Sequence, residues 1–235
     1  MPVLRSLALA AAVALLTGCV WLRLLSWKEQ LADFDRYFEP LEAEGSLVLR
    51  FREPCIRPAD IGWLLGGSEP SAVLPQDAGG VRVQWRLVRP QRAGLPLIIE
   101  LSARDAAAET LAESIRAPPE LVSLVSAPRL LAMARAFGRA RIDRERRSAS
   151  AELDAAARAA PRPGRAGVIA AFGEPDDEAA GAGGRRILRY RYHLAMPDGG
   201  AGAASELEFE LLDEALRALR VRTPRFHAWL EFAER

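Results

Sequence analysis

The hydrophobic positions of the chain follow two different spacings. Between residues 21 and 41 they recur mostly at steps of three and four, which predicts an amphipathic helix ending near Pro40. Elsewhere hydrophobic and polar residues alternate, as they do in half-buried antiparallel strands. The alternating segments predict strands at Leu47–Phe51, Val81–Val88, Leu97–Leu101, Leu188–His193, Leu207–Leu211 and Ala218–Arg222, with a weaker candidate at Ser150–Leu153.

The sequence also repeats itself at an offset of 105 residues. Each copy predicts a short helix behind a proline, at Ile61–Leu65 and at Val168–Phe172, then a Glu-Pro turn and strands. Without a gap, the offset aligns Arg57-Pro58 with Arg162-Pro163, Gly62 with Gly167, Glu69-Pro70 with Glu174-Pro175, and Trp85-Arg86-Leu87 with Tyr190-Arg191-Tyr192.

The N-terminus has the features of an export signal. After Arg5 and Ser6 come ten uncharged residues, LALAAAVALL, a run too short for a membrane-spanning helix, which needs roughly 20. The run ends in Leu16-Thr17-Gly18-Cys19, which resembles the lipobox of bacterial lipoproteins. That resemblance implies cleavage before Cys19 and its acylation, with two or three acyl chains forming a stable membrane anchor. An uncleaved anchor is the alternative.

The residues that follow Cys19 indicate in which membrane the protein is anchored. The lipoprotein family uses an acidic residue there for retention in the inner membrane, and this chain has Val20 and Trp21 instead. The resemblance therefore implies the outer membrane, with the protein facing the periplasm. Trp21 and Trp27 either sit at the membrane interface, where indoles are favoured, or pack on the folded body.

These patterns predict an α+β fold made of two related units, each a helix plus a small antiparallel sheet. The expected division is a signal peptide at 1–18, a lipid-anchored helix or tether at 19–45, a first unit at 46–115, a helical, arginine-rich connector at 116–149 and a second unit at 150–235.

The second unit resembles a known family. The run Gly167 to Pro175, the strand Arg189-Tyr190-Arg191-Tyr192 and the alternating Leu207 to Leu211 are similar to the SmpA/OmlA (BamE-like) outer-membrane assembly lipoproteins. Tandem copies of that fold also occur in the proteinaceous β-lactamase inhibitors. The resemblance implies the fold more directly than the function. The candidate partner-binding residues are the strand residues Trp85, Arg86, Tyr190, Arg191 and Tyr192.

Charge is balanced over the whole chain, because Lys+Arg 32 and Asp+Glu 31 give a formal net charge of +1. No general electrostatic attraction to nucleic acid is expected. The one local bias is the arginine-rich stretch from Arg129 to Arg147. It is either a solvated face or a surface for anionic lipid headgroups, lipopolysaccharide phosphates or an acidic partner.

Motifs for catalysis are missing from the sequence. It has no Gly-x-Ser-x-Gly elbow, His-Glu-x-x-His pair, Walker loop or dinucleotide fingerprint, so neither catalytic residues nor a cofactor or metal is predicted. His193 and His227 are interpreted as structural or exposed, and Cys55 as a small buried hydrophobe rather than a reactive thiol. The acidic run at residues 176–178 is interpreted as a turn rather than a calcium site.

The sequence-based hypothesis is a non-enzymatic lipoprotein, held in the outer membrane by acyl chains on Cys19, that binds another envelope protein. Outer-membrane protein assembly or envelope integrity is the setting that the resemblance implies. A periplasmic enzyme inhibitor or a hydrolase-type enzyme on the same duplicated fold is the alternative, and a purely structural anchor is another.

Overall fold

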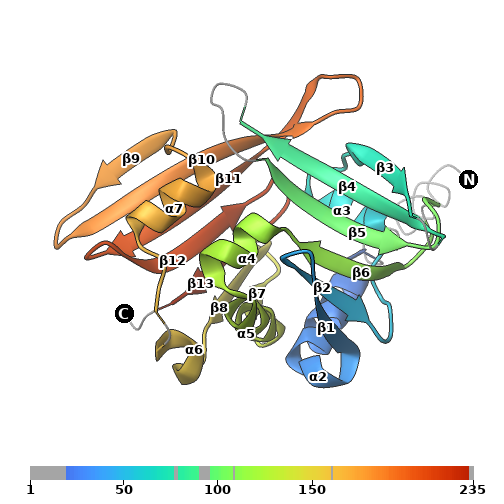
Figure 1. Cartoon of the computed structure of the whole chain (residues 1–235), viewed down its shortest axis with the longest axis horizontal. Helices are drawn as coiled ribbons and strands as arrows, with labels where there is room; N and C mark the ends of the chain where they lie inside the picture. Colours follow the sequence, from blue (N-terminus) through green and yellow to red (C-terminus); the bar gives the residue numbers. More distant parts are fainter. Residues whose placement is uncertain (1–19, 77–78, 90–95, 108, 160, 233–235) are drawn as a thin grey trace, which may run out of the picture.

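The computed structural model describes residues 20–76, 79–89, 96–107, 109–159 and 161–232 (Figure 1). Within this part the fold is mixed α+β, with thirteen strands in one sheet. The order along the sheet is β1-β2-β6-β5-β4-β10-β11-β12-β13-β8-β7, and β3 and β9 pair with β4 and β10. All pairings are antiparallel except β13 with β8. The predicted α+β class is therefore confirmed.

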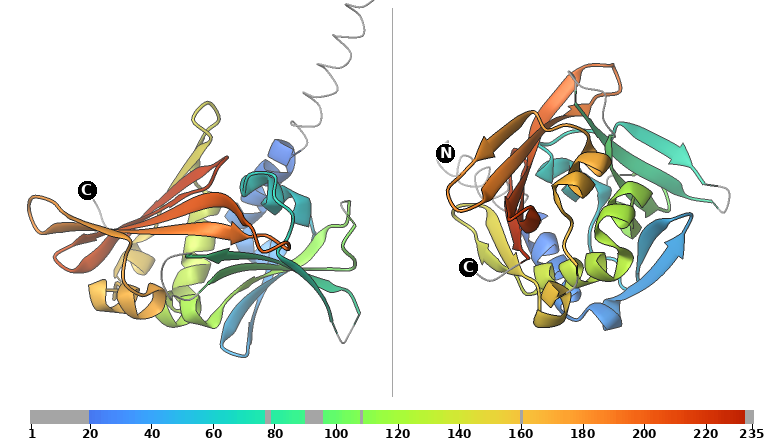
Figure 2. Two further views of the ribbon diagram at one scale, coloured as in Figure 1. Left: turned by 90° about the horizontal axis from the view of Figure 1, so that it is seen from above. Right: turned by 60° about the vertical axis from the view of Figure 1, so that its left-hand side comes forward.

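The strands of the first half are β1 (Phe38–Ala43), β2 (Ser46–Phe51), β3 (Ala72–Pro75), β4 (Val81–Val88), β5 (Leu97–Ala103) and β6 (Ala112–Ala117). Those of the second half are β7 (Arg141–Asp143), β8 (Ser148–Glu152), β9 (Asp177–Ala180), β10 (Arg185–Ala195), β11 (Ala201–Leu212), β12 (Ala215–Arg222) and β13 (His227–Glu231). The strands of both halves surround a group of helices in the right-hand view of Figure 2.

The helices are residues 20–32, α2 (Phe34–Tyr37), α3 (Pro58–Leu64), α4 (Pro119–Val125), α5 (Ala127–Gly138), α6 (Ala155–Ala159) and α7 (Arg165–Phe172). Proline begins α3 and α4 because the first helical turn needs no N–H donor there. α7 ends at Gly173, whose φ of 75° suits glycine.

The single helix expected over residues 21–41 is wrong in its second half. The chain leaves the helix at Asp33, forms the short α2, and continues as β1 from Phe38. Glu44 and Gly45 both have positive φ, which is the geometry of a tight hairpin turn, and β1 pairs with β2 across it. Pairing with β2 across this turn overrides the helical spacing of these residues.

Several hydrogen-bonding patterns recur at the offset of 105. Ala72 pairs with Gln84 in the first half, and Asp177 with Arg189 in the second. The Trp85 indole N–H donates to the carbonyl oxygen of Ser68 at 3.4 Å, and the Tyr190 hydroxyl to that of Gly173 at 3.0 Å. At the seam between the halves, β4 and β10 pair through Val88↔His193 and Leu87↔Leu194.

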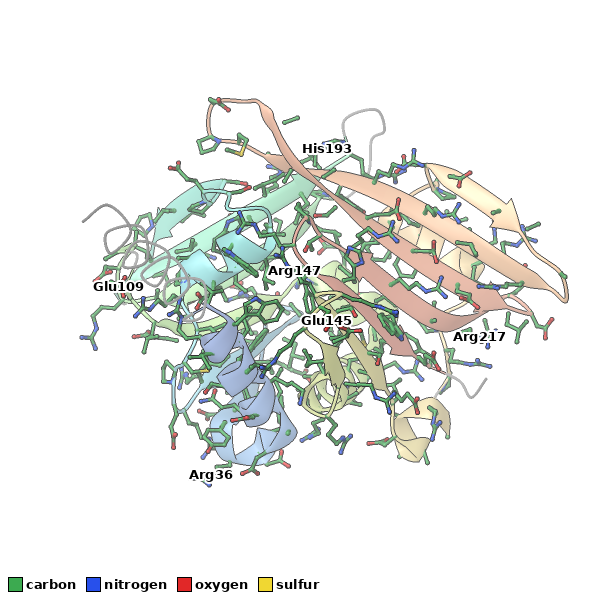
Figure 3. The ribbon with its side chains drawn as sticks, turned by 180° about the vertical axis from the view of Figure 1, so that it is seen from behind. Arg36, Glu109, Glu145, Arg147, His193 and Arg217 are labelled. Carbon is green, nitrogen blue, oxygen red and sulfur yellow. The ribbon has the colours of Figure 1, made fainter. Side chains whose placement is uncertain are left out.

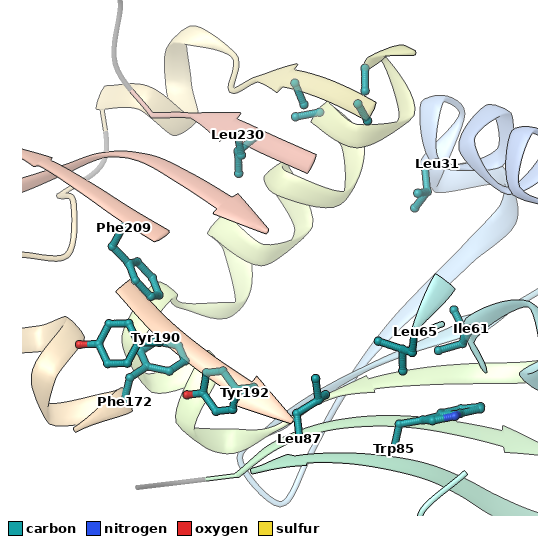
Figure 4. Close-up of a cluster of buried hydrophobic side chains, with 14 of the residues drawn as sticks. Leu31, Ile61, Leu65, Trp85, Leu87, Phe172, Tyr190, Tyr192, Phe209 and Leu230 are labelled. Atoms are coloured by element: carbon teal, nitrogen blue, oxygen red, sulfur yellow. The ribbon is translucent and has the colours of Figure 1, made fainter. Parts of the chain in front are cut away.

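One hydrophobic core runs through both halves (Figure 4). Alternate residues of β4 and β10 are buried, with Trp85 exposed by 1% and Tyr190 by 0%. Phe172 of α7, Tyr190 and Phe209 of β11 form a cluster with ring centroids 5.0–5.7 Å apart. Aromatic groups at this separation add to the stability that their burial supplies.

The segment 116–149, expected to be a helical connector, contains α4 and α5 but also β7 and the start of β8. These strands extend the far end of the sheet, where β8 pairs with β13. The weak strand predicted at residues 150–153 corresponds to β8. Strands β1, β3, β6, β7, β9 and β13 were not among the predicted elements, because each is short or interrupted by charged or small residues.

Candidate functional site

The predicted acylation site, Cys19, lies outside the described residues, and the described helix begins at the next residue. Arg23 fixes this helix to α3 through a bidentate ion pair with Asp60, with Nη2 to Oδ1 at 2.6 Å and Nε to Oδ2 at 2.8 Å. The Asp60 side chain is fully buried and also accepts the Arg57 backbone N–H at 2.9 Å. The start of helix 20–32 is therefore held firmly against the body.

Aromatic packing reinforces the same contact. The Trp21 ring packs edge-to-face against the rings of Trp63 and Phe226, with centroid separations of 5.8 Å and 6.4 Å. The Arg225 guanidinium lies over the Trp63 ring at 5.1 Å. Of the two positions considered for Trp21 and Trp27, the structure shows packing on the body, since both are only partly exposed.

An apolar pocket of about 340 Å³ lies beneath helix 20–32. This volume is at the low end of the range typical of small-molecule sites, roughly 300–1,000 Å³. Lys28 is the only charged residue in its lining. The lining residues are Trp21, Leu24, Leu25, Trp27, Lys28, Leu31, Leu49, Leu64, Ile115, Ala134, Phe137, Ile142, Ala149 and Phe226.

The pocket was not predicted from the sequence. Its lining combines one face of helix 20–32 with two residues of α5, single residues of β2, α3, β6, β7 and β8, and Phe226, which are far apart along the chain. The only signal was the apolar stripe at Trp21, Leu24, Leu25, Trp27 and Leu31, which also fits ordinary core packing.

The aromatic members of the predicted partner-binding set lie in the core. Trp85, Tyr190 and Tyr192 are each exposed by no more than 1%, so the expectation that they present themselves to a partner is corrected. Alternate residues of a strand point to the same face, and these three lie on the face that packs against the helices. Burial raises the pKa of Tyr192 to about 12. Arg86 and Arg191 point to the opposite face and are exposed.

That opposite face carries a ladder of ion pairs across β10, β11 and β12 (Figure 3). Glu210, whose side chain is only 5% exposed, forms ion pairs with Arg185 at 3.0 Å, Arg217 at 3.3 Å and Arg220 at 2.9 Å. Glu208 pairs with Arg189 at 3.1 Å and also with Arg220. Because these charges are mutually satisfied, the face is a structural network more than a free charged surface.

The arginine-rich stretch is divided between the interior and a polar groove. Arg129 is buried and donates to the backbone oxygens of Ala157, at 3.2 Å, and Pro161, so it is neither solvated nor ligand-facing. Arg135 pairs with Asp35 at 2.6 Å. The groove, of about 1050 Å³, is lined by Arg139, Arg141, Asp143, Arg146, Ser148, Ser150, Glu152, Arg158, Trp229, Glu231, Ala136 and Ala151.

The residues of the acidic run are engaged in ion pairs. Asp176 pairs with Arg89 at 2.8 Å, Asp177 with Arg189 at 2.5 Å, and Glu178 with Arg186 at 2.6 Å. Among the described residues, no group of three or more His, Cys, Asp or Glu side chains could hold a metal ion.

Cys55 and the histidines complete the set of residues considered for chemistry. Burial raises the pKa of the Cys55 thiol to about 11, and its Sγ donates to Gln30 Oε1 at 3.1 Å. His193 is half-buried at the β4–β10 seam, and His227 is exposed on β13. The two histidines lie on different strands that do not pair with each other.

Comparison of the chain with protein-family models, curated proteins and solved structures gives no significant match. Within the described part of the chain, no single helix is long and apolar enough to cross a membrane. By length and composition alone, α4 and α5 together could do so, but they meet at a bend of 90°.

Proposed function

We propose that this chain is a lipid-anchored outer-membrane lipoprotein that faces the periplasm and works as a non-catalytic binding module. One observation carries the proposal. The lipobox-like Leu16-Thr17-Gly18-Cys19 ends one residue before a helix that the Arg23–Asp60 ion pair fixes to the body. Acyl chains on Cys19 would therefore hold the folded body close to the bilayer surface, with no long linker between them.

We also propose that the fold consists of two duplicated units of the BamE-like kind. The equal offsets of the β3–β4 and β9–β10 registers support this reading, as do the matched hydrogen bonds of Trp85 and Tyr190. Val88 pairs with His193 at the seam, and these positions are themselves 105 residues apart. An antiparallel seam centred on equivalent residues is what a two-fold arrangement of similar units produces.

The surface best suited to a protein partner is the edge strand β3. It pairs only with β4 among the described strands, which leaves its other edge open. Val73 and Leu74 on this strand are exposed by 43% and 37%. An open edge with exposed apolar side chains favours the addition of a strand from another protein. Arg86, on the outer face of β4, would contact the same partner.

The test is an affinity purification from crosslinked envelopes with four forms of the protein: the parent, Cys19→Ala, Val73→Lys and Ala180→Lys. Lysine on an edge strand discourages strand addition. Ala180→Lys places the same charge on β9, the corresponding strand of the second half, and serves as the matched control.

The proposal expects the parent and Ala180→Lys to enrich a defined envelope protein, such as an outer-membrane assembly component. Val73→Lys should lose that protein while remaining in the membrane fraction. Cys19→Ala should lose both the protein and the membrane association. Equal enrichment by Val73→Lys and the parent would overturn the β3 surface, and membrane association of Cys19→Ala equal to that of the parent would overturn the anchor.

A further inference from the structure

We propose that the apolar pocket beneath helix 20–32 binds the hydrocarbon chain of a single-chain anionic amphiphile, with its head at Lys28. The lining comes from both halves of the chain, with Leu49 and Ile115 on one side and Phe137, Ile142 and Ala149 on the other. The pocket is therefore a built part of the fold, lined by strands near both ends of the sheet and by helices between them.

The lining determines the class of ligand. Leucine, isoleucine, alanine, phenylalanine and tryptophan side chains offer no hydrogen bonds along the pocket except through the indole groups, so a ligand gains affinity mainly by burying hydrocarbon. A volume of about 340 Å³ is small for a protein ligand site and suits one chain rather than two.

The head group follows from the one cation in the lining. Lys28 makes no salt bridge with any residue that the structure describes, so its ammonium group is available to a carboxylate or phosphate. An acyl chain on Cys19 would carry an ester or amide head and no anion to pair with Lys28. The charge therefore favours a free amphiphile from the membrane over the chain's own anchor, and the membrane source rests on the proposed function.

Binding can be measured without the anchor. A chain of residues 19–235 carrying Cys19→Ser keeps every residue that the structure describes and has no acylation site. Saturated fatty acids of increasing length would displace the fluorescent probe cis-parinaric acid from this protein. Each methylene that enters the pocket should tighten binding about fourfold, from about 0.8 kcal/mol per buried methylene, until the pocket is full and the affinity levels off.

Three variants locate the site. Ala134→Phe fills the pocket from α5 and should weaken fatty-acid binding by at least about tenfold. Lys28→Glu should weaken dodecanoate by a similar factor and leave dodecanol, which has no charge, unchanged. Arg52→Glu reverses an exposed charge outside the lining and is the matched control, expected to bind both ligands as the parent does. Circular dichroism checks that each variant is folded.

The proposal fails if the unacylated parent shows no saturable binding, or if affinity does not depend on chain length. It also fails if Lys28→Glu weakens dodecanol as much as dodecanoate, because the cation would then have no role in recognising the head. Should Ala134→Phe not fold, the Lys28→Glu comparison still decides the matter. None of these results depends on the anchor, which the fractionation of Cys19→Ala tests separately.

Discussion

Gly138, the last residue of α5, packs directly against the backbone of helix 20–32. A Cβ atom added at Gly138 would lie 2.5 Å from the carbonyl oxygen of Leu31, and closer still to the carbonyl carbon of Leu31 and the backbone nitrogen of Ala32. All three atoms belong to the backbone, so no side chain can rotate away. Gly138→Ala must therefore displace one helix from the other by more than about 1 Å to restore ordinary contact.

The cost can be set against a matched substitution. Overpacking a core typically costs about 1–3 kcal/mol, and alanine recovers at most about 1 kcal/mol of helix propensity. Gly138→Ala should therefore lower the free energy of unfolding by about 1–2 kcal/mol. A methyl group added at Gly167, inside α7, would meet only Leu124 Cδ1, at an ordinary 3.6 Å. Gly167→Ala should raise that free energy by about 0.5–1 kcal/mol.

Urea denaturation followed by tryptophan fluorescence measures both variants, since Trp21 and Trp27 on helix 20–32 report on its packing. Thermal unfolding should show Gly138→Ala melting several degrees below the parent and Gly167→Ala about 2 °C above it. If Gly138→Ala were as stable as Gly167→Ala, the close contact between the two helices would not exist in solution, and the placement of helix 20–32 would be wrong.

Three individual contacts give further predictions. Arg23→Met leaves the buried carboxylate of Asp60 without its cation and should cost about 3 kcal/mol in urea denaturation, whereas a loss below about 1 kcal/mol would contradict a tight ion pair. At pH 8, Cys55 should react with iodoacetamide about 100-fold more slowly than an ordinary thiol, because its pKa is raised from 9.0 to about 11, and equal rates would show that the thiol is not buried. Hydrogen bonds, first from Arg165 and then from Arg186, lower the pKa of Glu178 from 4.5 to about 2. The stability that ionised Glu178 gives the fold is therefore complete above pH 4.5 and disappears as the pH falls towards 2. Glu178→Gln should flatten that part of the stability–pH curve, and an unchanged curve would refute the assignment.

The alternating strands were predictable because one face of each packs on helices and the other meets solvent. Val81–Val88 matches β4 in both its bounds and its buried side chains. Strands β1 and β13 were not predictable, because β1 depends on its hairpin with β2, and β13 on β12 and the distant β8, more than on their own sequence patterns. The helix spacing over residues 21–41 failed for this reason.

The candidate sites were harder to predict than the fold. Aromatic residues on a strand are typical of both a core and a binding face. Trp85 and Tyr190 are buried, so they belong to the core. Arg129 lies in a basic stretch but satisfies backbone oxygens inside the fold, which no charge pattern reveals. The apolar pocket forms only when elements that are distant in the sequence come together. The sequence therefore shows the apolar stripe of helix 20–32 but not the cavity.

The most direct test of the lipid anchor is the intact mass of the protein extracted from membranes. The expected species is a mature chain that begins at Cys19 and carries the added mass of two or three acyl chains, and the Cys19→Ala form should lack them. A mass equal to the unmodified chain of residues 1–235, found in the same membrane fraction, would contradict the lipid anchor and with it the proposed position of the body at the bilayer.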